Sequence, residues 1–251
     1  MWRRGRAVWP RLRPLPGARW RMPEFLIFTL TANLGAMGDL AGHERRGSLG
    51  WPGRSAILGL LGAAMGIERN GDFSALDGLR MAVAVFDQGQ PLRDYHTVET
   101  IPTAAAKRPQ SRPEALRVDR LRTNTTITLR DYRQGALYGV AVWGGDLLPL
   151  CAGLLRPGFT LYLGRKSCPL AAPVGARIVQ AESVEAALAG VQLPPWREGA
   201  VAKLLICDAT DAPAETHREQ RHDQPLDRAK WHFAPREVAF QAVHIAPGGQ
   251  P

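Results

Sequence analysis

Cysteine is scarce in this sequence, and the few cysteines are widely spaced. Cys151, Cys168 and Cys207 are odd in number and form no C-x-x-C pair, which argues against a disulfide framework and a zinc site and favours a reducing cytoplasm. Long apolar runs are also missing. The longest, residues 56–67, is a dozen residues with three glycines, too short for a membrane span. We therefore expect a cytoplasmic protein, away from membranes, that needs no metal or cofactor.

The motifs of several large enzyme classes are absent as well. The sequence has no G-x-x-x-x-G-K-[ST], G-x-S-x-G, H-E-x-x-H or G-x-G-x-x-G pattern, which argues against the common nucleotide-binding, serine-hydrolase and metalloprotease classes. Residues 53–55 begin like a nucleophile elbow, but Ile57 stands where the second glycine should be. His217 and His222 are five apart in a polar segment, and we interpret them as solvated.

Basic residues are concentrated at the start of the chain. The net charge is +9, yet residues 1–21 hold seven of the 32 basic residues and no acidic one, so 25 basic residues remain against 23 acidic ones. Because the body is nearly neutral, only local patches can indicate nucleic-acid binding. Met22 directly precedes a good first strand, so we expect residues 1–21 to be a basic leader, disordered or absent from the mature protein. A basic arm that touches RNA is the alternative.

Length and composition favour a folded protein with one large domain, or one medium and one small domain. Of the 251 residues, 45% are apolar and 22% charged, near the average for globular proteins. Strands and helices are predicted in the order β-α-β-(excursion)-β-α-β, at residues 24–31, 55–67, 81–87, 137–143, 146–155 and 159–163. This is the order of the ferredoxin-like fold, which belongs to the α+β class.

The remaining segments carry weaker patterns. Glycine-rich residues 33–53 predict a loop, and polar, proline-punctuated residues 88–124 predict a protruding excursion. From residue 171 the sequence predicts a smaller β-rich C-terminal domain with an exposed loop at 208–230. Its strands and one serine-capped helix are expected at residues 174–180, 183–188, 203–207 and 237–245.

The predicted helix 55–67 is apolar on every face. Ser55 is placed as its N-cap, and the lack of a polar side predicts burial all round. Each interior glycine costs about 1 kcal/mol relative to alanine, so we expect a backbone or sheet to pack closely here, unless glycine is merely tolerated. The helix amides and Arg54 form a candidate anion site. A simple capped helix with a surface arginine is the alternative.

The excursion carries the clearest local charge. Residues 107–133 hold eight basic and three acidic residues, and a second basic patch lies at 156–166. Guanidinium groups bind phosphate oxygens bidentately, and tyrosines stack on unpaired bases. Tyr95, Tyr132 and Tyr162 each lie within three residues of a basic side chain. The pattern favours RNA binding, and a solvated charged face is the alternative.

Three motifs give the chain a resemblance to a known family. They are Trp51–Ile67 (WPGRSAILGLLGAAMGI), Arg93–Val98 (RDYHTV) and Tyr162–Leu170 (YLGRKSCPL). In this order and at these separations they resemble the CasD family of type I-E CRISPR Cascade surveillance complexes, within the RAMP superfamily. The likeness covers residues 22–170 and continues more weakly to the C-terminus.

The resemblance implies a fold and a role. The expected fold is a ferredoxin-like (RRM-like) palm at 22–170 with a β-hairpin thumb inserted at about 88–135, followed by a small C-terminal β-rich domain at 171–251. The expected role is non-catalytic: the subunit holds the 5′ handle of CRISPR RNA and caps the backbone filament in antiviral defence. The implied partners are CRISPR RNA, the backbone subunit and the large PAM-reading subunit, with target DNA contacted indirectly.

The resemblance also implies RNA-binding residues. Arginines would anchor phosphates, and aromatic side chains would stack on bases or wedge between them. The expected contacts are Arg54, Ser55, Tyr95, His96, Arg130, Tyr132, Arg165, Lys166 and Ser167. Two positions depart from the family pattern, because Gly53 replaces a threonine and Gly135 replaces a frequent aspartate.

Two other functions stay open. Type I-C relatives are metal-independent endoribonucleases that process precursor CRISPR RNA. Here His96 could act as a general base beside Tyr95, with Arg93 or Lys107 steadying the phosphate. A protein-interaction module without an RNA role is the third possibility.

Overall fold

The computed structural model describes residues 22–41, 44–101, 116–117, 123–214, 216–227 and 232–248. The predicted leader at 1–21 and most of the basic segment 102–122, including Lys107, lie outside these residues. Within the described part, the protein is a mixed α+β structure dominated by sheet, with few helices, as the sequence predicts. None of the helices described is long and apolar enough to cross a membrane.

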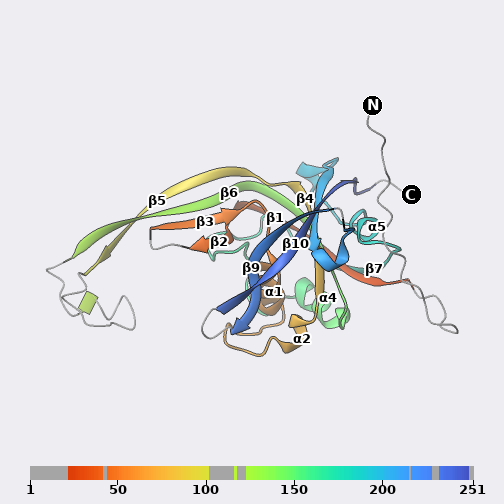
Figure 1. Ribbon diagram of the computed structural model, residues 1–251, viewed down its shortest axis with the longest axis horizontal. Helices are drawn as coiled ribbons and strands as arrows, with labels where there is room; N and C mark the ends of the chain where they lie inside the picture. The colour runs from red at the N-terminus through yellow and green to blue at the C-terminus, as the bar shows by residue number, and fades with distance from the viewer. Residues whose placement is uncertain are drawn as a thin grey trace.

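The elements follow one another with strands in the majority (Figure 1). The strands are β1 Glu24–Gly35, β2 Met37–Ala41, β3 Arg45–Leu49, β4 Arg80–Asp87, β5 Gln90–Thr100, β6 Asn124–Trp143, β7 Arg177–Gln180, β8 Ala202–Asp208, β9 His217–Asp227 and β10 His232–Ile245. The helices are α1 Arg54–Ala64, α2 Ser74–Asp77, α4 Leu147–Leu155 and α5 Val184–Leu188, with short 3-10 turns η1 Pro195–Arg197 and η2 Ala209–Asp211.

Strand β6 joins the two parts of the sheet. Its second half lies between β1 and β4 in the body of the molecule, and its first half pairs with β5 and touches β3. Residues 90–100 and 124–134 therefore form a long two-stranded projection, which we call the arm (Figure 1). Across the body, the antiparallel order is β7-β1-β6-β4-β8-β10-β9.

The body of the sheet is buried on both faces. Alternate residues of β1 separate into two apolar clusters, with Leu26 and Phe28 in one and Phe25 and Ile27 in the other, as expected for a strand covered on both sides. The first cluster includes side chains of α1 and α4, and the second includes α5. Helices on both faces thus fix the body rigidly at the root of the arm.

Helix α1 differs from its prediction at the N-terminus. It begins at Arg54 with Gly53 as N-cap, and no side chain caps it, so the assignment of Ser55 as N-cap is wrong. Close packing at its glycines is confirmed at two positions. A Cβ on Gly62 would collide with the Phe73 ring. Gly66, just past the end of α1 at a φ of +72°, packs closely on Gly158, where a Cβ would lie 2.8 Å from Gly66 Cα.

The third glycine of the predicted helix 55–67, Gly59, does not fit that prediction. Gly59 is exposed, and a Cβ there would have nothing within 4 Å. Expected burial all round is therefore wrong on this side of the helix. Gly59 faces open space, whereas Gly62 faces the ring that α1 packs on.

Three other segments were predicted incorrectly. Residues 33–53 contain β2 and β3 rather than a loop, and residues 208–230 contain β9 rather than an exposed loop. β2 pairs with the neighbouring strand β3, β9 pairs with the neighbouring strand β10, and β3 also pairs with distant β6. β3 and β9 are polar and lack the apolar alternation on which strand prediction depends. Residues 159–163 form no strand, since Phe159 N donates to Ala63 O at the end of α1 and Tyr162 makes an isolated bridge to Pro169.

The C-terminal strands extend the same sheet. β8 pairs along β4 from Ala82↔Cys207 to Val85↔Leu204, and β10 pairs with β8 in turn. The helix predicted at 183–188 is present as α5, capped by the Ser183 side chain, which accepts a hydrogen bond from Ala186 N at 3.1 Å. A continuous sheet therefore crosses residue 171, and a division there into separate folding units stays a prediction.

Candidate nucleic-acid interface

The motif at residues 162–170 forms a tight loop against the junction of β1 and β2. Leu163 O accepts a hydrogen bond from Ala36 N at 3.0 Å, and Leu163 N donates to Cys168 O at 2.8 Å. Leu163 and Cys168 are fully buried. A Cβ on Gly164, whose φ is +87°, would collide with the Ala36 carbonyl. The loop is therefore anchored at both ends and displays the residues between them.

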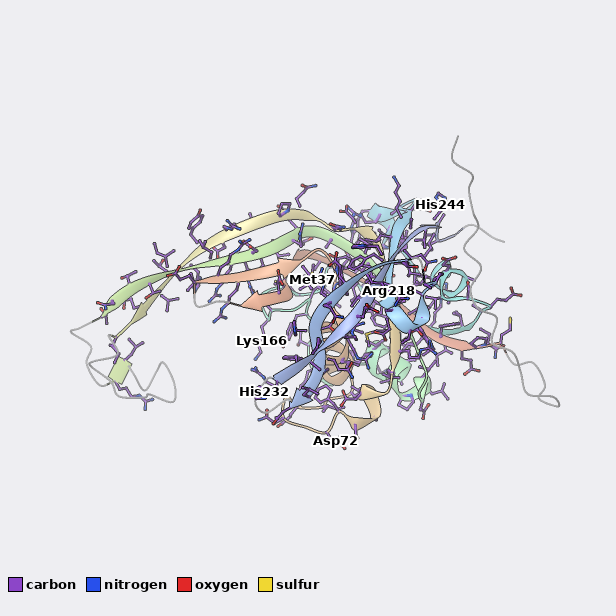
Figure 2. All side chains as sticks on the ribbon, in the orientation of Figure 1. Met37, Asp72, Lys166, Arg218, His232 and His244 are labelled. Carbon is purple, nitrogen blue, oxygen red and sulfur yellow. The ribbon has the colours of Figure 1, made fainter. Side chains whose placement is uncertain are left out.

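The displayed residues meet the base of the arm. The Arg165 guanidinium lies over the Tyr132 ring, 4.6 Å from its centroid, and Arg165 Nη2 is 3.5 Å from Arg46 O. We define the root cluster as Arg46, Arg130, Tyr132, Arg165 and Lys166. Lys166 is exposed, and Figure 2 shows it between the arm and the end of the β9–β10 hairpin marked by His232.

The root cluster contains hydrogen-bond donors without protein partners. Arg130 Nε and Arg165 Nη1 are both buried and have no hydrogen-bond partner among the described residues. A buried guanidinium donor left unpaired is costly. Two such guanidinium groups, one of them stacked on the buried Tyr132 ring, lie near the exposed Lys166 and make a surface suited to an anionic ligand.

The pairing register of the arm separates residues that are neighbours in sequence. Residues directly opposite in an antiparallel pair share one face, so Tyr95 lies with Leu129 and His96 lies with Thr128, on opposite faces. Tyr132 is on the His96 face, and Tyr95, which is 72% exposed, is on the other. Tyr95 and His96 therefore do not share one site.

The Tyr95 face carries an ion cluster of its own, formed by Arg45, Arg93 and Asp131. Asp131 Oδ1 accepts a hydrogen bond from Arg93 Nε at 2.7 Å, and Asp131 Oδ2 accepts from Arg45 Nη2 at 2.9 Å. Hydrogen bonding to Arg93, followed by hydrogen bonding to Arg45, holds the pKa of the Asp131 carboxyl below its ordinary value. We call this cluster the arginine clamp.

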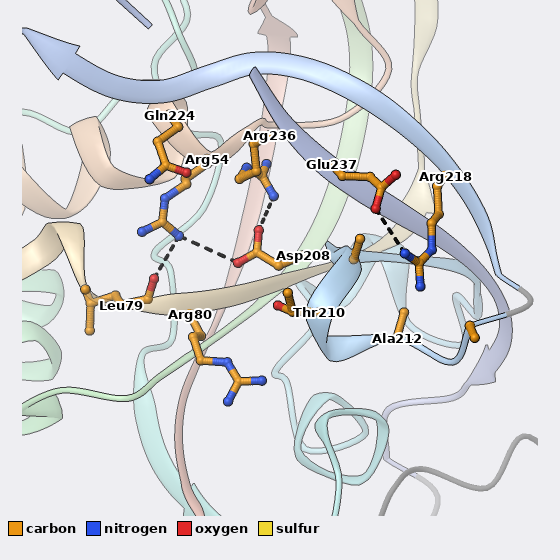
Figure 3. Close-up of a pocket in the computed structure, with 13 residues that line it drawn as sticks. Arg54, Leu79, Arg80, Asp208, Thr210, Ala212, Arg218, Gln224, Arg236 and Glu237 are labelled. Atoms are coloured by element: carbon orange, nitrogen blue, oxygen red, sulfur yellow. Dashed lines mark hydrogen bonds and ion pairs between the residues drawn. The ribbon is translucent and has the colours of Figure 1, made fainter. Parts of the chain in front are cut away.

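Arg54 lies in a buried charge network away from the root cluster. Its guanidinium donates to Leu79 O at 2.8 Å and Asp77 O at 2.6 Å, and it is 3.9 Å from Asp208. Arg236 pairs with Asp208 and also with Asp223. Figure 3 shows Arg54 and Arg236 both directed at Asp208, beside an open cavity of about 600 Å³.

An internal carboxylate occupies the predicted anion site of α1. Asp223 Oδ2, on β9, accepts a hydrogen bond from Arg54 N at 2.7 Å. A Cβ on Gly53 would lie 2.8 Å from this oxygen. The carboxylate thus supplies the negative charge that a helix N-terminus favours, and it leaves little room for a side chain at residue 53.

The structure therefore gathers some predicted residues and separates others. Arg130, Tyr132, Arg165, Lys166 and the adjacent Ser167 lie at one place, with His96 further along the same face of the arm. Tyr95 is on the other face, and Arg54 and half-buried Ser55 are at the start of α1. A contact between RNA and Arg54 or Ser55 stays a prediction.

Sequence reasoning missed two arginines that β3 brings to the arm. Arg45 and Arg46 pair in parallel with Leu129 and Arg130 of β6. Their positive charge is visible in the sequence, but the pairing joins segments more than 80 residues apart. No local pattern records such a contact. Among the residues described, no group of three or more His, Cys, Asp or Glu side chains could hold a metal ion.

Comparison with known proteins identifies the family of this chain. The chain belongs to the Cas5 family of CRISPR-associated proteins, since the model of that family, CRISPR-associated protein (Cas_Cas5), matches residues 25–239. The particular relative it resembles is the CRISPR system Cascade subunit CasD of Escherichia coli (strain K12), which is 34% identical over 188 residues. This match covers 66% of the present chain and 76% of CasD.

Two solved structures have a similar fold. One is a chain of a CRISPR RNA-guided surveillance complex, with a TM-score of 0.66 at 24% identity, and the match covers 89% of this chain and 94% of that one. The other is a Cas protein, with a TM-score of 0.59 at 27% identity, and the match covers 90% of this chain and all of that one (100%).

Proposed function

We propose that this protein is a non-catalytic subunit of a cytoplasmic Cascade-type ribonucleoprotein. In this role it holds the 5′ handle of CRISPR RNA and caps the backbone filament. The proposed partners are CRISPR RNA, the backbone subunit and the large PAM-reading subunit, with target DNA reached indirectly through the assembled complex. Membership of the Cas5 family and the likeness to CasD support this assignment.

The root cluster is the observation that carries the proposal. Arg130 and Arg165 each place a buried, unpaired guanidinium donor beside Tyr132 and the exposed Lys166. Phosphate oxygens would accept charge-assisted hydrogen bonds from the partly exposed Arg130 and Arg165 and from Lys166. The Tyr132 ring is buried beneath Arg165, so the Arg165 guanidinium plane is the surface on which a splayed base would stack. A single RNA strand with its bases unpaired meets both requirements.

We further propose that the body is a ferredoxin-like palm and that the arm is its thumb. The elements β1, α1, β4, β6, α4 and β7 follow in the β-α-β-β-α-β order. Their strands lie in the antiparallel order β7-β1-β6-β4. The fourth palm strand is therefore β7 instead of residues 159–163, and the proposed palm extends to Gln180, past the predicted boundary at residue 170. The arm is inserted between β4 and the palm half of β6, where the chain leaves the body and returns.

The geometry of the arm favours holding over cutting. Cleavage through a 2′-hydroxyl needs a base and a stabilising group around one phosphate, but Tyr95 and His96 lie on opposite faces of β5. His96 Nδ1 is 3.9 Å from Asp94 Oδ2, beyond hydrogen-bond length. Incubation of the purified protein with its cognate repeat RNA in EDTA tests this point. Site-specific cutting that is lost in His96→Ala would contradict the non-catalytic role.

Crosslinking tests the proposed function itself. Cascade-type particles would be assembled with guide RNA that carries a photoreactive nucleotide at one position of the 5′ handle at a time. We expect crosslinks from at least one handle position to peptides that contain residues 165–167 or 130–132. A control RNA that carries the reactive group at its 3′ end should give none there. Handle crosslinks confined to other subunits would refute the proposal.

A further inference from the structure

The arm has a second basic surface that the proposed handle site does not use. The arginine clamp lies on the face of β5 and β6 opposite Tyr132 and Arg130, because Arg93 pairs with Asp131 and Arg130 pairs with Asp94 in the alternating register. Arg45 reaches the same face from β3. A ligand bound there would contact the arm from the side opposite the root cluster.

Among the described residues, the contacts of the clamp leave one edge of each guanidinium free for a ligand. Arg93 uses Nε and Nη2 on Asp131, and Arg45 also uses Nε and Nη2 on the same carboxylate. Each guanidinium has five N–H donors, so each keeps its Nη1 donors and a second Nη2 proton. The Arg45 side chain is 62% exposed and the Arg93 side chain 43% exposed. These donors are therefore open to solvent.

The charge of the clamp also fits an anion. Two guanidinium groups around one carboxylate leave a net charge of +1, and Arg133 is paired with Pro91 on the same face. Asp131 counteracts the mutual repulsion of the arginines and fixes their rotamers before any ligand arrives. Binding then loses less conformational freedom than it would with two unrestrained arginines.

Fold stability alone gives little reason for such an arrangement. Ion pairs between exposed side chains contribute little to stability, because water and salt screen them. Both arginines are largely exposed, and the clamp is on the projecting arm rather than in the core. The same arrangement is well suited to bidentate recognition of phosphate.

Tyr95 completes the surface. It lies two residues beyond Arg93 on the same strand face and is among the most exposed large apolar side chains of the described residues. Residues i and i+2 of a strand are about 7 Å apart on one face. An exposed ring at that distance from the guanidinium groups can stack on a base while they hold its phosphate.

We propose that Arg45 and Arg93, held by Asp131, bind one phosphodiester of a single-stranded nucleic acid, and that Tyr95 stacks on an adjoining base. The inference rests on the proposed function, because it places a nucleic-acid strand along both faces of the arm. The strand is either a further part of the guide RNA or the target strand paired with it nearby.

The test uses the complete RNA-loaded complex with an Arg45→Gln, Arg93→Gln double variant. A matched control is Arg177→Gln, an exposed arginine on β7 at the far side of the body (Figure 1). One assay measures retention of guide RNA, and a second assay measures capture of complementary single-stranded DNA. We expect roughly tenfold weaker binding in at least one of the two assays. The slope of log affinity against log salt concentration should be about 0.7 less steep, the value of one lost phosphate contact.

The Asp131→Asn variant distinguishes binding by preorganised arginines from binding by positive charge alone. The substitution raises the net charge of this face, so general electrostatic attraction predicts tighter binding. If Asp131 instead acts by fixing the rotamers of both arginines, its loss should weaken binding on the order of threefold. Tighter binding by Asp131→Asn would overturn the proposal. Unchanged binding by the Arg45→Gln, Arg93→Gln variant in both assays would also overturn the proposal.

A parallel Arg165→Gln, Lys166→Gln variant keeps the two proposals distinguishable. If this variant loses handle RNA while the clamp variant behaves as wild type, the inference fails and the proposed function stands. If the clamp variant loses binding while the root-cluster variant does not, the handle site has been misplaced. If the clamp variant loses binding in only one of the two assays, that assay identifies the strand that the clamp binds.

Discussion

The guanidinium of Arg165 stacks over the ring of Tyr132 at 4.6 Å, and this contact joins the loop that follows α4 to the root of the arm. The two residues are 33 positions apart in the sequence and meet because the 162–170 loop is fixed at Ala36. The stack fixes the position of the Arg165 guanidinium at the proposed RNA-binding site.

Replacement of Tyr132 tests the stack. Tyr132→Phe keeps the ring, so we expect handle binding within about twofold of wild type. Tyr132→Leu removes the π face, and a cation–π contact contributes about 0.5–2 kcal/mol, so binding should weaken by about two- to thirtyfold. Fluorescence anisotropy with labelled handle RNA measures the difference. Equal losses in both variants would show that the hydroxyl, not the ring, matters.

Gly164→Ala tests the anchoring of the 162–170 loop. A Cβ would collide with the Ala36 carbonyl, and the φ of +87° is unfavourable for alanine. Gly199→Ala is the control, since its φ is +78° but nothing lies within 4 Å of its Cβ position. We expect about 1–2 kcal/mol of destabilisation in the control from strain and clearly more in Gly164→Ala, by denaturant unfolding. Equal destabilisation would contradict the close packing at Ala36.

The contact between Gly53 and Asp223 predicts energetic coupling. Gly53→Ala places a Cβ 2.8 Å from Asp223 Oδ2 and should destabilise the protein by about 1–3 kcal/mol, as overpacking does. In an Asp223→Ala background the space is free, so the same change should cost less than about 1 kcal/mol. A double-mutant cycle measures this coupling. Strict additivity of the two changes would show that they do not interact.

The arginine clamp predicts a pH-dependent contribution to stability. The pKa of Asp131 in the folded protein is below its ordinary value of 3.8, chiefly because Arg93 donates hydrogen bonds to it. The stability it contributes is therefore complete above pH 3.8 and is lost as the pH falls through the lower folded value.

Comparison of wild type with Asp131→Asn measures that contribution. The difference in free energy of unfolding should be constant from pH 7 to about pH 5 and should shrink as the pH falls below 3.8. Because both arginines are exposed, we expect the difference to be small throughout. A difference that grows as the pH falls would contradict the ion pairing described here.

The apolar strands and capped helices were readable from the sequence. β1, β4, the second half of β6, α4 and α5 carry apolar runs or caps whose stability is largely local in origin. β3 and β9 were missed because they are polar strands without apolar alternation. Both are ordered by backbone pairing, β9 with the neighbouring β10 and β3 with the neighbouring β2 and distant β6. Residues 159–163 have strand-like composition, but hydrogen bonding to the end of α1 decides their conformation.

The candidate site was readable in part for similar reasons. Arg165, Lys166 and Tyr132 stand in motifs whose charge and aromatic content are visible, and the structure brings them together. The separation of Tyr95 from His96 follows from strand alternation once β5 is known. Arg45 lies on the arm because β3 pairs with β6, and Asp223 accepts a hydrogen bond from Arg54 N at the start of α1. Both contacts join residues far apart in the sequence, so no local sequence pattern predicts them.

Handle binding by an Arg165→Gln, Lys166→Gln variant tests the central claim most directly. The assembled complex would be titrated with 5′-handle RNA at several salt concentrations, with Arg177→Gln as the control. We predict at least roughly tenfold weaker binding and a salt slope less steep by about 1, with an unchanged unfolding temperature. Wild-type affinity and slope in the doubly substituted complex would contradict the assignment of the root cluster as the RNA-holding site.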